Sequence, residues 1–246
     1  MRKLYFLLVG LFLFSGVKAQ IVNIPDANFK AKLLESSFIA KDLSGNYFRI
    51  DANNDGEIQV SEAQNVRELD VFKSSISSLA GITSFSNLRS LVCYENHLTS
   101  LNVSGLTNLA YLDCSDNSLP SLDVSGLTNL KTLYCSSNSL PSLDVNGLTN
   151  LAFLECSSNQ LTSLNLSGMT KLNILFCFQN QLTTLDLSGL SNLEELYVGN
   201  NPLGTLDYSK VLNLKKLWIG YTPISTLDLS NLKKLTSLNV SSCPNL

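Results

Sequence analysis

The chain has 246 residues, of which 44% are hydrophobic and 15% are charged, and its formal net charge is −3. Such a sequence is too apolar to remain disordered, and its charge argues against a nucleic-acid partner, which requires a basic surface. The single histidine, His97, argues against Ser–His or Cys–His catalysis and against zinc sites built from several histidines. The composition therefore favours a folded protein that is not an enzyme.

The first 19 residues have the pattern of a secretory signal peptide. Arg2 and Lys3 give a positive start, Leu4–Phe14 is an apolar run, and the small residue Ala19 precedes the expected cleavage point. A membrane anchor is the alternative, but this run is shorter than the roughly 20 residues needed to cross a bilayer. We therefore predict a secreted or cell-surface protein whose mature chain has no transmembrane segment.

Residues 20–65 precede a series of repeats and are predicted to form an N-terminal cap. A short amphipathic helix is expected after Pro25, with Phe29 and Leu33 on its apolar face. The ends of a stacked repeat array need such a cover, because the outermost repeat otherwise exposes its core.

An acidic segment of the cap, Asp51–Glu62, matches the pattern D-x-[DN]-x-[DN]-G-x5-E at every specified position. It resembles an EF-hand calcium loop, in which Gly56 permits the sharp turn. The resemblance implies a structural Ca²⁺ held by side-chain oxygens of Asp51, Asn53, Asp55 and Glu62, by the carbonyl of Glu57, and by Gln59 directly or through a water. Residues 42–46 break any long entering helix, so the alternative is an Asp/Asn/Gly turn that folds without metal.

From Val66 onward the sequence repeats itself. Leucines recur every 21 residues, at positions 88, 109, 130, 151, 172, 193, 214 and 235, and a first copy begins 22 residues earlier. Alternating inward residues indicate one strand per copy, and a single strand cannot bury its apolar face, so the copies must stack. An asparagine recurs at positions 96, 117, 138, 159, 180 and 201, where its amide can satisfy backbone groups at the bend after each strand.

The repeated phrase L-x-x-L-x-[LC]-x-x-N-x-L resembles the leucine-rich repeat. The resemblance implies a solenoid over residues 66–246, with a parallel β-sheet on the concave face, extended or 3₁₀ backbone on the convex side and a small helical cap before it. Because the last copy breaks off within a repeat, we expect the solenoid to be C-terminally incomplete.

Five of the six cysteines, at positions 93, 114, 135, 156 and 177, occupy one slot that later copies fill with Val or Ile. We expect a stack of buried thiols that act as small hydrophobes. Disulfides between adjacent copies are the alternative in an exported protein, but parallel side-chain directions disfavour the dihedral angle that a disulfide needs.

A cap with the run Ile24–Phe29, an acidic loop and Leu-x-Cys-Ser-x-Asn repeats of 21–22 residues resembles bacterial internalin-like proteins. The resemblance implies an exported protein that binds another macromolecule through the concave sheet.

Aromatic residues gather at positions expected to face outward from that sheet. On the strands these are Tyr134, Phe176, Tyr197 and Trp218, with Glu155 among them, and nearby outward positions add Tyr94, Tyr111, Phe153, Phe178 and Tyr221. A contiguous apolar patch marks an interaction site, and Tyr and Trp are frequent binding anchors. We predict that these residues bind a protein partner. A polysaccharide stacked on the same rings, in a surface protein or in the non-catalytic arm of a glycan-active enzyme, is the alternative, as is simple packing of the rings on one another.

Catalysis would require a matched set of reactive groups. Glu95 and Asp116 occupy the same outward slot in adjacent copies, with backbones ~5 Å apart, near the carboxylate spacing of retaining glycosidases. Every pair of like positions in a solenoid has that spacing, however, so it carries no specific information. We predict no enzymatic activity.

Overall fold

The computed structural model describes residues 20–35 and 38–246. The predicted signal peptide lies outside this part of the chain, and the cap begins where the description begins. Over the described ranges, no helix has both the length and the apolar character that crossing a bilayer requires.

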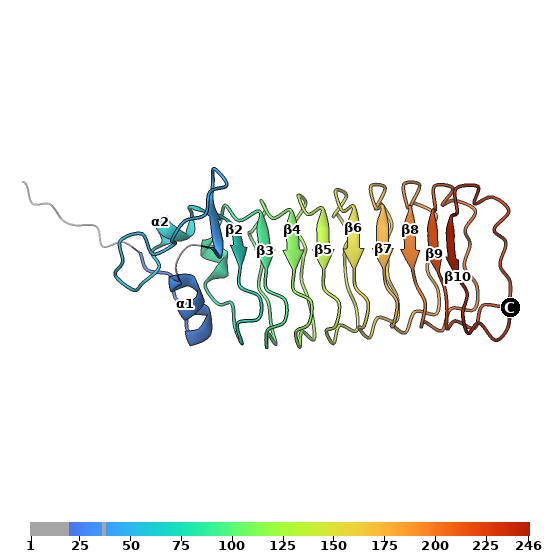
Figure 1. The fold of residues 1–246 in the computed structure, drawn as a ribbon, viewed down its shortest axis with the longest axis horizontal. Helices are drawn as coiled ribbons and strands as arrows, with labels where there is room; N and C mark the ends of the chain where they lie inside the picture. The colour runs from blue at the N-terminus through green and yellow to red at the C-terminus, as the bar shows by residue number, and fades with distance from the viewer. Residues whose placement is uncertain (1–19, 36–37) are drawn as a thin grey trace, which may run out of the picture.

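The cap is built from two short helices and one strand (Figure 1). Helix α1 (Ala27–Leu34) begins after Asp26, whose side chain accepts a hydrogen bond from the Phe29 N–H. Phe29 and Leu33 are fully buried and belong to the same core as the repeats. The predicted amphipathic helix is therefore present, and it packs on the first coil through its apolar face.

Strand β1 (Ala40–Asp42) and helix α2 (Val60–Ala63) complete the cap. Strand β1 pairs antiparallel with β2 (Val66–Asp70), so the cap adds one strand to the edge of the solenoid sheet. This pairing gives the first coil a hydrogen-bonded neighbour on its outer side, which is how the cap covers the end of the stack.

The repeats form one ten-stranded sheet with β1, in which the strands follow chain order and those from β2 onward pair in parallel (Figure 1). The strands after β2 each have three residues: β3 (Ser90–Val92), β4 (Tyr111–Asp113), β5 (Thr132–Tyr134), β6 (Phe153–Glu155), β7 (Ile174–Phe176), β8 (Glu195–Tyr197), β9 (Lys216–Trp218) and β10 (Ser237–Asn239).

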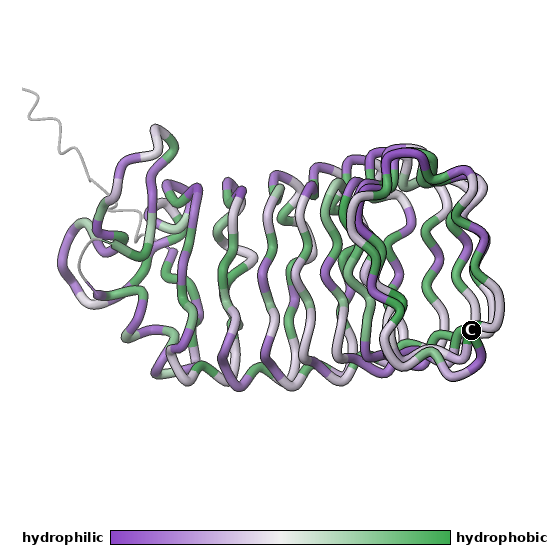
Figure 2. Tube along the Cα trace, turned by 45° about the vertical axis from the view of Figure 1, so that its right-hand side comes forward, coloured by the Kyte–Doolittle hydropathy of each residue, from purple (hydrophilic) through white to green (hydrophobic). Residues whose placement is uncertain are grey.

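Each coil closes around a leucine core. The central leucine of every strand from β3 to β9 is at most 2% exposed, and hydrophobic residues recur along every coil (Figure 2). The return segments between strands are chains of turns, such as that closed by the Leu106 N–H donating to the Val103 carbonyl at 3.2 Å. One 3₁₀ helix, η1 (Ile82–Ser84), interrupts this pattern in the first return segment. The structure confirms the predicted leucine-rich-repeat solenoid.

Two ladders inside the solenoid match their predictions. The five cysteines of the repeat slot are free and fully buried, and burial raises the pKa of each of these thiols. Asn180 illustrates the asparagine ladder: its amide donates to the Cys156 carbonyl at 3.0 Å and the Cys177 carbonyl at 3.2 Å, and it accepts from the Leu161 N–H at 3.0 Å. Each such amide therefore joins two neighbouring coils.

Candidate binding surface and acidic loop

The strands display two parallel rows of side chains on the solvent side of the sheet. In β3 to β8 the first and third residues are half-buried while the middle leucine is buried. The pairing register stacks the first residues into one row and the third residues into another. We call these the first row (Ser90, Tyr111, Thr132, Phe153, Ile174, Glu195, Lys216, Ser237) and the third row (Val92, Asp113, Tyr134, Glu155, Phe176, Tyr197, Trp218, Asn239).

Aromatic rings from both rows form a continuous series of contacts. Ring centroids lie 4.6 Å apart for Tyr134 and Phe153, 5.7 Å for Phe153 and Phe176, and 4.3 Å for the stacked pair Phe176 and Tyr197. Each ring is half-buried, because neighbours cover part of it and solvent the rest. The complete series, here called the ring chain, is Tyr111, Tyr134, Phe153, Phe176, Tyr197, Trp218 and Phe178.

Two of the predicted aromatic residues lie outside the ring chain. Tyr94 stacks on Phe72 at 5.0 Å, forming a separate pair near the cap. Tyr221 lies in the turn after β9 with φ 61° and is 56% exposed. It occupies the turn slot that other copies fill with Glu95 or Asp116, so its ring is not part of the row on the sheet.

Gly220 makes room for the end of the ring chain, and Gly199 allows the close approach of the Gly220 backbone. Phe178, Gly199 and Gly220 occupy one slot in successive coils, and a Cβ added at Gly220 would lie 2.9 Å from the Trp218 indole nitrogen. The indole can therefore lie over the backbone and contact Phe178 at 5.2 Å. A hollow of about 310 Å³ opens beside it, lined by Tyr197 and residues of β9 and β10. Sequence analysis missed these glycines, although they replace serine or phenylalanine in their slot.

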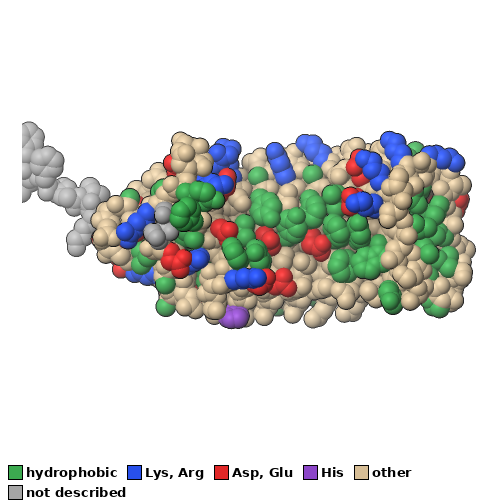
Figure 3. Space-filling view, viewed as in Figure 1, with side chains coloured by type: hydrophobic (Ala, Val, Ile, Leu, Met, Phe, Trp, Pro, Cys, Tyr) green, Lys and Arg blue, Asp and Glu red, His purple; other side chains and the backbone are tan. Residues whose placement is uncertain are grey.

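Two carboxylates lie among the rings. Asp113 on β4 and Glu155 on β6 flank Tyr134 in the third row, and acidic side chains are visible among the hydrophobic ones on this face (Figure 3). Burial raises the pKa of both groups. The hydroxyls of Ser157 and Ser115 oppose the shift, as do backbone hydrogen bonds from Ser115 to Asp113 at 3.1 Å and from Ser157 to Glu155 at 3.0 Å. Sequence analysis singled out Glu155 but not Asp113, which occupies the same slot.

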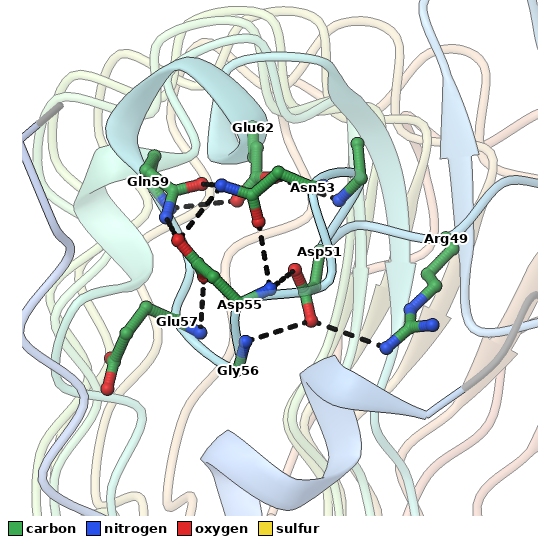
Figure 4. Close-up of polar contacts among 9 residues, drawn as sticks. Arg49, Asp51, Asn53, Asp55, Gly56, Glu57, Gln59 and Glu62 are labelled. Carbon is green, nitrogen blue, oxygen red and sulfur yellow. Dashed lines mark hydrogen bonds and ion pairs between the residues drawn. The ribbon is translucent and has the colours of Figure 1, made fainter.

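The acidic loop lies between β1 and α2 and folds around its own side chains (Figure 4). Asp51 is 1% exposed, accepts hydrogen bonds from the backbone of Asp55 at 3.2 Å and Gly56 at 3.3 Å, and pairs with Arg49 at 3.3 Å. Gly56 has φ 79°, so it makes the sharp turn that the motif requires.

The other predicted ligands of the loop are also hydrogen-bonded. The Asp55 carboxylate accepts from the amides of Asn53 at 2.9 Å and Gln59 at 2.8 Å, and Glu62 accepts from the Gln59 N–H at 3.0 Å, which caps α2 (Figure 4). The Glu57 side chain pairs with Lys30 at 2.7 Å, so Glu57 would offer a metal its backbone carbonyl and not its carboxylate.

The loop folds as a hydrogen-bonded turn whose side chains carry several oxygens of the kind that can coordinate a metal. Within residues 20–35 and 38–246, no three Asp, Glu, His or Cys side chains converge as a metal site. The loop also joins a strand to a four-residue helix, not two long helices. The donor chemistry nevertheless suits Ca²⁺, which prefers carboxylate and amide oxygens. Binding would exchange the Asn53–Asp55 and Gln59–Asp55 hydrogen bonds for metal contacts.

Solved structures with the same fold come from bacteria and plants. The functional domain of InlJ from Listeria monocytogenes, which includes a cysteine ladder, is 25% identical over 93% of this chain and 63% of that domain, with a TM-score of 0.50. Internalin C2 from the same species is 23% identical over 92% of this chain and 98% of its own, with a TM-score of 0.73. This chain thus spans less than two thirds of the InlJ domain.

A plant protein shares the repeat architecture as well. The leucine-rich-repeat ectodomain of the receptor kinase GASSHO1/SCHENGEN3 from Arabidopsis thaliana, solved in complex with CASPARIAN STRIP INTEGRITY FACTOR 2, is 24% identical over 74% of this chain and 25% of that ectodomain, with a TM-score of 0.68. No protein-family model and no curated protein sequence matches the chain. The chain thus has the leucine-rich-repeat fold that these internalins share, and, like the InlJ domain, it contains a stack of cysteines.

Proposed function

We propose that this chain is an exported or cell-surface recognition protein, not an enzyme, and that it binds a protein partner through the ring chain. The observation that carries the proposal is the unbroken series of ring contacts from Tyr111 on β4 to Trp218 on β9. A sheet face open to water is ordinarily polar, and a contiguous apolar patch on it marks a contact surface.

Mutual packing of the rings supports this function as well as the fold. The rings hold one another in place, so little side-chain entropy is lost when a partner covers them. Part of each ring still faces solvent, and burying it contributes roughly 25 cal/mol per Å² of apolar surface. Tyr and Trp are the residue types that most often dominate the energy of protein interfaces.

The acidic pair considered for catalysis has an ordinary surface environment. Glu95 is in a turn and pairs with Lys73 at 3.1 Å, and Asp116 occupies the equivalent turn of the next coil. Neither lies in the rows that hold the rings. A binding role for the sheet face therefore accounts for more of the structure than a hydrolytic one.

The hollow beside Trp218 favours a polysaccharide as the second candidate ligand. Its walls combine the Tyr197 and Trp218 rings with the polar side chains of Lys216, Ser237 and Asn239. Rings that stack on a sugar, with polar groups beside them, would suit a glycan chain. The ring chain extends well beyond this hollow, over β4 to β9, which is why a protein partner is preferred.

Trp218 is the only tryptophan of the chain, so its fluorescence can report on this surface directly. We would titrate the mature protein with candidate surface proteins and with polysaccharides. Under the proposal, a protein produces a saturable shift of emission that Tyr197→Ala abolishes and Tyr221→Ala leaves intact, because Tyr221 lies off the ring chain. A response to glycans alone would replace the protein partner by a polysaccharide. Silence across both panels from a folded protein would contradict both.

We further propose that the acidic loop binds Ca²⁺ weakly and thereby stabilises the cap. Asp51, Asn53, Asp55, Gln59 and Glu62 would supply side-chain oxygens and Glu57 its carbonyl. The expected affinity is ~10⁻⁴–10⁻³ M, typical of extracellular modules.

Calorimetry tests the calcium proposal. Millimolar Ca²⁺ should give heat of binding and raise the melting temperature, and Asp55→Asn should remove both effects. Asp186→Asn, an exposed Asp far from the loop in sequence, is the matched control and should keep them. The absence of heat with millimolar calcium would show that the loop is a turn that folds without metal.

A further inference from the structure

Tyr134 lies between two carboxylates that form no ion pair among the described residues. In the third row Asp113 pairs with Tyr134 on one side and Glu155 pairs with it on the other. Two strand spacings separate the acids, so their backbones are about 10 Å apart. The Tyr134 ring contacts Tyr111 at 5.7 Å and Phe153 at 4.6 Å, which places three rings beside the two acids.

Neither carboxylate has a cationic partner within residues 20–35 and 38–246. Among the described residues Asp113 and Glu155 form no ion pair, whereas Glu195 in the first row is paired with Lys216 at 2.9 Å. Each uses one oxygen to accept a backbone N–H, from Ser115 or Ser157. The half-buried charges are therefore left without a counter-charge, an arrangement that costs stability unless a cation arrives from outside.

Two buried hydroxyls lie next to these acids. Ser115 and Ser157 follow Asp113 and Glu155 by two residues and are 7% and 1% exposed. Each hydroxyl favours the charged form of the neighbouring carboxylate and so lowers its pKa, but burial outweighs this and raises the pKa of both acids. The local hydroxyls therefore do not replace a counter-charge, and a half-buried carboxylate is ordinarily paired with a cation in a finished interface.

We propose that this part of the sheet face receives a lysine or arginine side chain of the protein partner, with its charge at Asp113 and Glu155 and its stem on Tyr111, Tyr134 and Phe153. The inference rests on the proposed function and names the chemistry of its partner. An extended basic side chain suits the surface because its methylene groups pack on rings while its cationic end pairs with carboxylates. The rings add attraction for the cation through their faces.

Short peptides test the inference without knowledge of the partner. We would label the tyrosine rings with ¹³C and record their NMR shifts while adding acetyl-Gly-Arg-Gly-amide or acetyl-Gly-Lys-Gly-amide. The matched neutral peptides carry citrulline or acetyl-lysine. The charged peptides should shift the signals of Tyr111 and Tyr134 and bind at least tenfold more tightly than the neutral ones, and added salt should weaken them.

The double variant Asp113→Asn, Glu155→Gln separates charge from shape. Both replacements keep an oxygen for the Ser115 and Ser157 N–H groups, so the fold should be retained, which circular dichroism would verify. We expect at least a tenfold loss of binding of the charged peptides. The control double variant Glu95→Gln, Asp116→Asn removes the same charge from the neighbouring turns and should change binding less than twofold.

The outcomes distinguish this inference from the function on which it rests. Equal binding of charged and neutral peptides, or full binding by the Asp113→Asn, Glu155→Gln variant, would overturn the basic side chain while leaving a protein partner on the ring chain possible. A shift of the Tyr134 signal by a glucan oligosaccharide but not by the charged peptides would overturn it in favour of a glycan. Failure of the Trp218 titration with every protein, alongside charge-dependent peptide binding, would contradict the proposed function alone.

Discussion

Acidic residues on the two sides of each coil have opposite environments. In the return segments Asp123, Asp186, Asp207 and Asp228 are exposed, and hydrogen bonds from the serine two residues later lower the pKa of each. On the sheet face, burial raises the pKa of Asp70, Asp113 and Glu155. The first set is stabilised by the folded chain as anions, and the second set is not.

This difference separates polar groups that serve the fold from those that do not. A return-segment aspartate closes a local turn, as when Asp186 accepts from the Ser188 N–H at 2.8 Å. The repeat needs such a turn in each coil, so the residue recurs. Nothing in the repeat requires a carboxylate between two aromatic rings. The repeat does not need the sheet-face carboxylates, so a solenoid can vary at these positions without losing its fold.

The largest effect is expected from the asparagine ladder, which belongs entirely to the fold. Asn180→Ala would leave the Leu161 N–H buried without its acceptor, and it would remove one of the two amide donors to each of the Cys156 and Cys177 carbonyls, which keep Asn159 and Asn201. We expect a loss of about 3 kcal/mol in the free energy of unfolding, measured by urea denaturation.

Asn129→Ala is the matched control for the ladder. That residue is exposed and donates only to the Thr107 carbonyl, at 2.9 Å, so the loss should stay below about 1 kcal/mol. Similar losses in the free energy of unfolding for the two variants would show that burial does not determine how much these amides stabilise the fold.

Asn129 also belongs to a set of hydrogen bonds that the sequence did not predict. It belongs to a second series of amides, on the return segments, each donating to a carbonyl of the preceding coil. Where lysine replaces asparagine, Lys171 and Lys234 donate to the amide oxygens of Asn150 and Asn213 instead. The recurrence of Asn before Leu was visible in the sequence, but an exposed amide in a loop has no local feature that predicts a hydrogen bond to the preceding coil.

The repeat itself was predictable because one physical requirement fixes each of its slots. A 21-residue period with inward leucines leaves only a stack of strands, and the cysteine slot follows from the Val and Ile that replace it. The ring chain was predictable only as a set of outward residues. Which rings touch depends on side-chain directions, so the sequence could not show that Tyr221, in the turn after β9, lies outside the ring chain. Asp113 was visible in its slot, but only the structure shows its burial.

The second prediction concerns Asp26, a fold-serving acid at the junction of cap and solenoid. One carboxylate oxygen caps α1 through the Phe29 N–H, and the other accepts from Ser77 at 2.8 Å and Ser78 at 2.9 Å. Asp26→Ala should lower the free energy of unfolding by about 2 kcal/mol in urea denaturation. Asp26→Asn keeps an acceptor oxygen and should lose less than half as much.

The pH dependence of Asp26 has a definite sign. Burial opposes its ionisation, but the backbone hydrogen bonds together outweigh burial and lower its pKa in the folded protein. Its contribution is therefore complete above the unfolded pKa of about 3.9 and is lost as the pH falls through the folded value. The difference in melting temperature between the native protein and Asp26→Ala should shrink as the pH falls from 5 toward 3. A constant difference would exclude the charge as its source.

The smallest expected effect is the change in melting temperature when acidic charges are removed. It distinguishes the two kinds of acid because its sign is opposite on the two sides of the coil. Removing charge from the sheet face, with Asp113→Asn and Glu155→Gln, should raise the melting temperature at pH 7, since burial raises the pKa of both groups and the folded state disfavours their ionised form. Removing it from the return segments, with Asp186→Asn and Asp207→Asn, should lower the melting temperature, since hydrogen bonds lower those pKa values. The gain for the sheet-face variant should be about 0.5 kcal/mol.

The pH dependence of this pair of variants follows from the same shifts. The cost of the sheet-face charges is present above their raised folded pKa and disappears as the pH falls through it to the unfolded value, so the native protein and the sheet-face variant should converge in acid. A stability cost that persists at neutral pH is what a binding surface carries when its counter-charge comes from another molecule. If the sheet-face variant were instead less stable at pH 7, Asp113 and Glu155 would belong with the acids that serve the fold, and their place between the rings would need no partner.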